Sequence, residues 1–103
     1  MVVIVSQAWT KDAAASAEAY VAGSRDLAKL MAHHPGFRGR KLLRSQEDTT
    51  HFTHLRWFDS ASDYEALTKL PGYAEHIARL SAHLDLSKYE KSAREIMEVI
   101  LDE

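Results

Sequence analysis

The sequence contains no cysteine among its 103 residues. This absence excludes disulfide bonds, zinc sites with cysteine ligands, iron–sulfur clusters and thiol nucleophiles. Long hydrophobic runs are lacking as well. The N-terminal "MVVIV" is far shorter than the roughly 18 apolar residues of a membrane helix, and it lacks the basic start of a secretory signal peptide. The sequence therefore predicts a soluble, cytoplasmic protein with no membrane partner.

No surplus of positive charge is present. Thirteen Lys and Arg face fifteen Asp and Glu, which gives a formal net charge of −2. A nucleic-acid partner is therefore not predicted. The sequence also lacks a glycine-rich phosphate loop, a serine nucleophile elbow and a His-Glu-x-x-His zinc helix, so no metal site is predicted. The length fits one compact domain over residues 1–103.

Hydrophobic periodicity predicts an α+β fold with the order β-α-β-β-α-β. The predicted elements are a strand over 2–8, a helix from Lys11 with Thr10 as N-cap, strands over 36–45 and 51–58, a helix from about residue 60 that Pro71–Gly72 interrupts, and a strand over 94–102. This order is typical of a ferredoxin-like, four-stranded antiparallel sheet with both helices on one face. The first and last strands are apolar on both sides, which predicts that a second copy covers the open face.

Two sets of side chains alternate along the strand at 51–58. Phe52, His54, Arg56 and Phe58 share one face, because strand side chains point alternately to opposite sides. If this face looks toward the helices, His54 and Arg56 line an apolar pocket suited to a small molecule. If it is exposed, Arg56 extends to water. In the preceding strand, Arg38, Arg40 and Arg44 most simply form a solvent-facing side.

Other polar and aromatic residues have two interpretations each. His76 borders the inward stripe of its helix, where it is either a hydrogen-bonded boundary residue or a base or metal ligand. Gln7 either offers its amide to a pocket or ends a strand, and Trp57 is more typical of a core or interface. His33 and His34 complement the negative end of a helix and, being adjacent, make a poor metal pair.

Three segments together resemble a known family. "HPGFRGRKLLRS", "FTHLRWFDSASDYEAL" and "PGYAEHIARL" are similar to the pattern of the antibiotic biosynthesis monooxygenase (ABM) superfamily, the dimeric α+β barrels, over roughly residues 2–101. The resemblance implies a ferredoxin-like protomer whose sheet packs on the sheet of a partner. It also implies a pocket for a small hydrophobic or aromatic ligand between the helices and the sheet.

For the cofactor-independent oxygenases of this superfamily, the resemblance implies oxidation of a phenol, a quinol or a polyketide-like aromatic compound without a cofactor. A pocket base would deprotonate the substrate, and the substrate anion would transfer an electron to oxygen. His76 or His54 would be the base, and Arg56 and Gln7 would stabilise the anion. The other predicted substrate-binding residues are Trp57, Tyr64, Leu67 and Tyr73.

Two alternatives remain. The heme-degrading members imply heme binding through His76, with Gln7 at the place of an asparagine. Those members carry a tryptophan nine residues before the histidine, where this chain has Leu67, and this difference argues against heme degradation. The second alternative is a dimeric module that binds a small ligand without catalysis.

Overall fold

The computed structural model describes residues 1–89 and 94–103. The elements are β1 (Val2–Trp9), α1 (Ala15–Met31), β2 (Phe37–Arg44), β3 (His51–Phe58), α2 (Ala61–Thr68), α3 (Tyr73–Ser81), a 3₁₀ turn η1 (Leu86–Lys88) and β4 (Arg94–Glu98). The predicted second helix is divided at Pro71–Gly72 into α2 and α3, so the order is β-α-β-β-α-α-β. The predicted connection before β4 lies partly at residues 90–93, outside the described residues.

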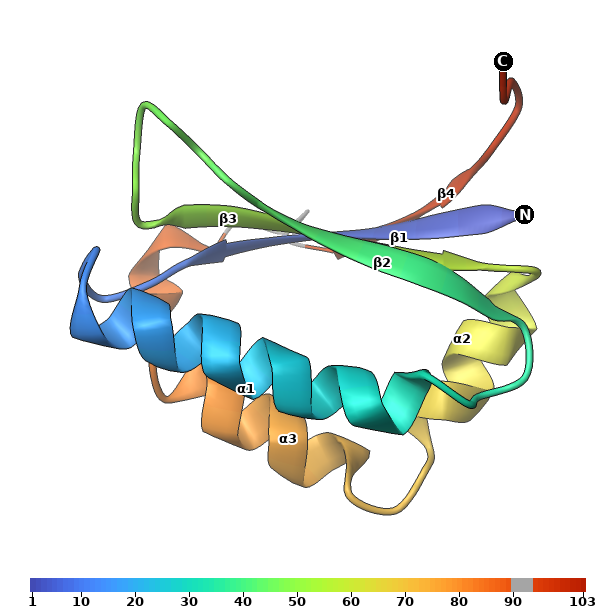
Figure 1. Ribbon diagram of the computed structural model, residues 1–103, viewed down its shortest axis with the longest axis horizontal. Helices are drawn as coiled ribbons and strands as arrows, with labels where there is room; N and C mark the ends of the chain where they lie inside the picture. Colours follow the sequence, from blue (N-terminus) through green and yellow to red (C-terminus); the bar gives the residue numbers. More distant parts are fainter. Residues whose placement is uncertain (90–93) are drawn as a thin grey trace.

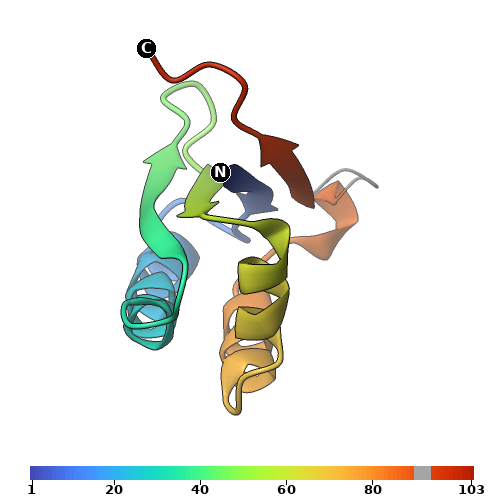
Figure 2. The same cartoon turned by 90° about the vertical axis from the view of Figure 1, so that its right-hand side faces the viewer.

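The four strands form one antiparallel sheet in the order β2-β3-β1-β4. The helices cover one face of this sheet, and the C-terminal tail extends from β4 on the other side (Figures 1 and 2). This arrangement confirms the ferredoxin-like fold. The last strand is shorter than predicted, because β4 pairs with β1 only from Glu98 to Arg94. The pairing stops at the start of β1, so the apolar residues that follow have no strand beside them.

The core lies between the helices and the sheet. Ile4, Leu27, Met31, Phe58 and Leu67 are fully buried there. On β3 the burial alternates strictly, and the buried face is the one that carries His54 and Arg56. The sequence left the direction of this face open, and the structure turns it toward the helices. Two polar side chains therefore project into the hydrophobic layer.

The ends of α1 differ from the prediction. The helix begins at Ala15 rather than Lys11, with Ala14 as its N-cap residue. Asp12 lies just before it, and Asp12 Oδ1 accepts hydrogen bonds from the backbone N–H of Ala14 at 2.9 Å and of Ser16 at 3.0 Å. These bonds lower the pKa of Asp12. Thr10 is instead buried, and its hydroxyl donates to the Asp12 carbonyl.

The C-terminal end of α1 also lies earlier than predicted. The helix ends at Met31, so His33 and His34 belong to the turn that follows rather than to the last helical turn. His34 Nε2 lies 2.9 Å from the Asp63 carbonyl oxygen at the start of α2. This contact ties the turn after α1 to α2.

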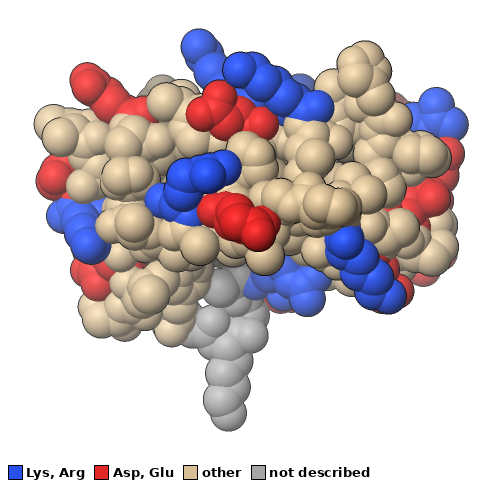
Figure 3. Space-filling view, turned by 90° about the horizontal axis from the view of Figure 1, so that it is seen from below, with Lys and Arg blue, Asp and Glu red and all other residues tan. Residues whose placement is uncertain are grey.

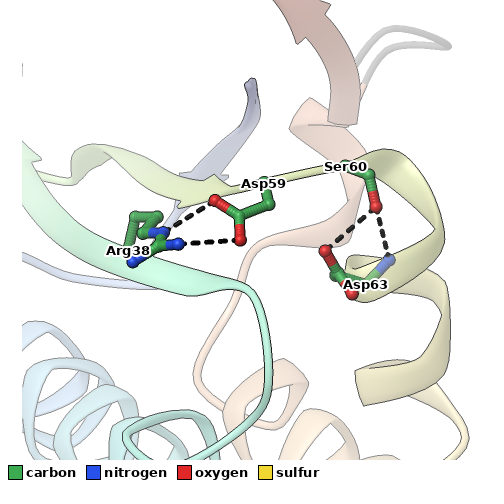
Figure 4. A network of polar contacts seen from close by, with 4 residues as sticks. All are labelled: Arg38, Asp59, Ser60 and Asp63. Atoms are coloured by element: carbon green, nitrogen blue, oxygen red, sulfur yellow. Dashed lines mark hydrogen bonds and ion pairs between the residues drawn. The ribbon is translucent and has the colours of Figure 1, made fainter.

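The start of α2 is held by two neighbouring polar pairs (Figure 4). Arg38 donates to both carboxylate oxygens of Asp59, at 2.7 and 2.9 Å. Ser60 Oγ accepts from the Asp63 backbone N–H at 3.3 Å, which is an N-cap hydrogen bond. Together they fix the chain where it leaves β3, and α2 then carries Tyr64 into the layer below the sheet.

The outer surface of the helical layer is mixed in charge. Seen from that side, acidic and basic side chains are interspersed among uncharged ones (Figure 3). In the part of the chain that the structure describes, no helix is both long and apolar enough to span a membrane. Within the same residues, no group of three or more His, Cys, Asp or Glu side chains is arranged to hold a metal ion.

Candidate functional site

A cavity of about 540 Å³ lies between the sheet and the helices. Its wall includes four tyrosines, Tyr20, Tyr64, Tyr73 and Tyr89, and aliphatic side chains of α1 and α3. Ser6, His54 and Arg56 contribute polar groups from β1 and β3, and Glu65 and Arg94 are exposed residues of the same wall. Small-molecule sites have this composition, mostly apolar with a few convergent polar groups.

Arg56 places a positive charge inside the cavity. The residue is only 4% exposed, its Nη2 donates to Ser6 Oγ, and its guanidinium carbon lies 5.4 Å from the centre of the Tyr64 ring. Its Nε is buried and has no hydrogen-bond partner among the described residues.

Arg56 has no counterion in the described part of the chain. The ion pairs seen there are Lys29–Asp26 and Arg38–Asp59, both on the surface. A buried charge without a partner is unfavourable, and an anionic ligand would relieve it.

His54 is neutral and has a defined tautomer. The residue is 6% exposed, and its Nε2 lies 3.3 Å from Arg40 Nη1. A guanidinium can only donate, so Nε2 accepts and the ring proton resides on Nδ1. Burial, reinforced by the charges of Arg56 and Arg40, lowers the pKa of His54 from 6.5 to about 3. His54 therefore presents an N–H donor rather than an imidazolium at neutral pH.

Three tyrosines of the wall, Tyr20, Tyr73 and Tyr89, are held in the protonated form by burial. Burial raises the pKa of Tyr20 and of Tyr73 to about 12, and it also raises the pKa of Tyr89. The Tyr64 hydroxyl accepts a hydrogen bond from Arg94 Nη1 at 3.1 Å, and the Arg94 guanidinium lies 5.4 Å from the Tyr64 ring centre. The Tyr64 ring is therefore in contact with two arginines, Arg56 and Arg94.

The family follows from a sequence comparison: the family model for antibiotic biosynthesis monooxygenase matches residues 1–79. The chain belongs to this family. A search of curated proteins found no match.

Solved structures share the fold with this family member. The chain is similar to SnoaB, a cofactor-independent oxygenase from Streptomyces nogalater, with 17% identity, a TM-score of 0.82, and coverage of 98% of this chain and 94% of that one. It is also similar to a conserved protein from Methanosarcina mazei Go1, with 16% identity, a TM-score of 0.75, and coverage of 92% and 86%. At these identities the likeness shows the fold alone.

Four of the predicted site residues meet in the cavity of this ABM protein: His54, Arg56, Tyr64 and Tyr73. Gln7 borders the cavity through its place on β1, but its side chain contacts the opposite face of the sheet. There Gln7 Oε1 accepts hydrogen bonds from His51 Nε2 and Thr53 Oγ1, each at 2.7 Å. The Gln7 amide is thus directed away from the charge of Arg56.

Three other predicted site residues lie elsewhere. His76 lines a hollow of about 280 Å³ between α1 and α3, with its Nδ1 3.2 Å from Arg79 Nη2. Trp57 pairs with Val3 on the face of the sheet away from the helices, and Leu67 is fully buried in the core. His76 therefore faces this small hollow and an arginine rather than the cavity. Heme ligation by His76 stays a prediction.

The sequence did not reveal the role of Arg40. It was interpreted as part of a solvent-facing side with Arg38 and Arg44, but the register of β2 shifts between Phe37 and Gly39. Gly39 has a φ of 136°, a conformation that glycine adopts readily, and the extra residue reverses the alternation. Arg40 consequently pairs with Arg56 and turns toward the helices. An Arg-Gly-Arg run inside a strand is the signal that could have indicated such a bulge.

Proposed function

We propose that this protein is a cofactor-independent oxygenase that oxidises a small phenolic or anthrone-like aromatic compound in the cavity below the sheet. The observation that carries the proposal is the buried Arg56 guanidinium, which contacts the Tyr64 ring and has no counterion among the described residues. Membership of the ABM family and the fold shared with SnoaB support the same reaction class.

The chemistry requires only the substrate anion and dioxygen. The anion transfers one electron to dioxygen, and the resulting carbon radical and superoxide combine to form a peroxide. Protonation of the peroxide and cleavage of its O–O bond, with loss of the remaining C–H proton, release water and leave a carbonyl group. In sum, a CH₂ group and O₂ give C=O and H₂O, so the substrate supplies all four electrons.

The protein contributes electrostatics and exclusion of water. Arg56 stabilises the substrate oxygen that bears negative charge, because a fixed positive charge in a low-dielectric site acts more strongly than one in water. His54 offers its Nδ1–H to the same oxygen. The tyrosine rings pack against the aromatic body of the substrate and keep the reactive intermediates dry.

A homodimer is part of the proposal. The open face of the sheet carries the exposed Leu43 and Met97, and the tail on that side of the sheet carries Ile100 and Leu101, which are 81% and 74% exposed. Apolar side chains gathered on one face favour association. Light scattering at micromolar concentration should give twice the 11.6 kDa of the chain, and a monomer would refute this part.

The test of the activity is oxygen uptake by chelator-treated protein supplied with an anthrone, whose CH₂ group is the one oxidised. We expect one O₂ consumed per substrate and a loss of about tenfold or more in kcat/KM for Arg56→Met, since one charge-assisted contact is worth about 1.5–3 kcal/mol. Arg38→Met is the matched control, because that arginine is on the surface with Asp59. Ligand binding without oxygen uptake would instead indicate a non-catalytic binding module.

A further inference from the structure

Among the residues that the structure describes, the inner wall of the cavity offers donors but no base. The Arg56 guanidinium has no lone pair to accept a proton, and a tyrosine hydroxyl is a weak base. The Nε2 lone pair of His54 already accepts from Arg40. Among the described residues, the one carboxylate in the cavity wall is that of Glu65 on α2, which is exposed. No described residue inside the cavity is placed to remove a proton from a bound phenol.

We propose that the cavity binds its aromatic ligand as an oxyanion that has ionised before binding, and that Arg40 is the positioning residue that holds His54 as a hydrogen-bond donor to this oxyanion. The proton goes to water before the ligand enters, and no covalent step involves the protein. The ligand class is thereby restricted to acidic phenols, naphthols and enols. The oxyanion site itself does not depend on the proposed function; only the statement that its ligand is the substrate does.

The placement of Arg40 supports its role. Arg40 Nη1 lies 2.6 Å from Ser24 Oγ and 3.3 Å from His54 Nε2, so the guanidinium is held between α1 and β3. Ser24 is buried at 2% exposure, and its hydroxyl accepts this bond. Arg40, held by Ser24, donates to Nε2 of His54 and so fixes the tautomer of the ring. The other ring nitrogen, Nδ1, remains free to donate to the ligand.

The charges around the ligand position favour an anion from several sides. Arg56 on β3 and Arg94 on β4 are in the wall, and Arg40 on β2 lies behind His54. Tyr20 on α1, Tyr64 on α2, Tyr73 on α3 and Tyr89 after η1 are the other titratable groups in the wall, with Glu65 on α2 as the opposing charge. Positive charge dominates where the wall is buried.

The test uses 4-nitrophenol, whose phenolate absorbs visible light whereas the neutral phenol does not. Protein in excess should lower the apparent pKa of the bound probe by about one unit or more, which is roughly a tenfold preference for the anion. A bound probe with an unshifted or raised pKa would overturn the proposal. The uncharged analogue 4-nitroanisole should bind about tenfold more weakly or worse, and equal binding would also contradict it.

Variants then separate the roles of the residues. Arg56→Met should abolish the shift, Arg40→Met should reduce it severalfold, and Arg40→Lys should restore most of it, because lysine still donates to Nε2. Arg38→Met is the control and should leave the shift unchanged. Glu65→Gln should preserve or increase the shift. A loss of the shift in Glu65→Gln, or no effect of Arg40→Met in folded protein, would contradict the assigned roles.

A measurement on the unaltered protein avoids any problem of variant folding. Long-range proton–nitrogen NMR should show the His54 proton on Nδ1, and a proton on Nε2 would overturn the role of Arg40. The probe experiment also distinguishes this inference from the proposed function. A shifted probe pKa without oxygen uptake keeps the anion site and refutes the oxygenase, whereas oxygen uptake with an unshifted probe does the reverse.

Discussion

Arg40 Nη1 lies 3.3 Å from His54 Nε2, although strand pairing sets His54 opposite Leu42 and Arg40 opposite Arg56. The contact is diagonal across neighbouring strands, a distance that a long side chain can span. Two arginines therefore act on one imidazole: Arg40 donates a hydrogen bond to it, and the charge of Arg56 helps to lower its pKa. The polar part of the site is thus a set of donors, arranged around a position that suits negative charge.

We predict that Arg56→Met does not destabilise the ligand-free protein. The substitution loses the hydrogen bond to Ser6 and the contact with the Tyr64 ring, about 1 kcal/mol each. It also removes the desolvation penalty of a buried charge that has no counterion among the described residues, which offsets the loss. Urea denaturation should give a free energy of unfolding equal to that of the wild type within about 1 kcal/mol, or higher. A decrease beyond about 3 kcal/mol would mean that Arg56 is structural.

The depressed pKa of His54 predicts a loss of stability in mild acid. An unfolded histidine takes up a proton near pH 6.5, whereas folded His54 does so only at about 3. Between these values the unfolded chain binds more protons, so the free energy of unfolding decreases as the pH falls from 6.5 toward 3. His54→Gln removes this contribution. In urea denaturation at pH 7 and pH 5, the variant should lose less stability than the wild type, and equal losses would contradict a buried neutral His54.

Leu67→Ala should affect stability rather than ligand selectivity. Leu67 is fully buried in the core, away from the cavity wall. Truncating such a leucine typically costs about 2–5 kcal/mol. Thermal unfolding should show the loss, while the pKa shift of bound 4-nitrophenol in folded protein should be unchanged. A changed shift with normal stability would assign Leu67 to the ligand site, as the sequence had suggested.

His76→Ala should leave ligand binding unchanged within about twofold, which is less than about 0.5 kcal/mol. Its imidazole lies beside Arg79 in the hollow between α1 and α3. Titration of the variant with 4-nitrophenol checks this expectation. A loss of affinity of tenfold or more would restore His76 as a site residue.

The sequence pattern predicted most of the fold, because hydrophobic periodicity and the Pro and Gly residues that end helices are local properties of the chain. The alternation on β3 placed His54 and Arg56 together, and Pro71–Gly72 marked the break between α2 and α3. The helix start was placed too early because Thr10 is not the N-cap: Ala14 is, and the side chain that accepts from the first-turn N–H of Ser16 is that of Asp12. Capping depends on which oxygen reaches the free N–H groups, and composition alone does not determine this.

The site was predicted less completely, because side-chain direction depends on register. The bulge at Gly39 reverses which side chains of β2 face the helices, and it brings Arg40 to His54. The Gln7 side chain lies on the face of β1 that points away from the helices, whereas the side chain of its neighbour Ser6 faces Arg56. His76 borders the inward stripe of α3, as predicted, and its side chain lines the hollow between α1 and α3. In each case a shift of one residue, or a rotation of part of a helical turn, decides which side chain enters the cavity.

Oxidation of an anthrone under isotopically labelled dioxygen tests the central claim most directly. The account predicts that chelator-treated protein forms the quinone with one labelled oxygen atom in the new carbonyl and the other in water, at a rate that Arg56→Met reduces about tenfold or more. A carbonyl oxygen derived from water, or a rate no higher than that without protein, would contradict it.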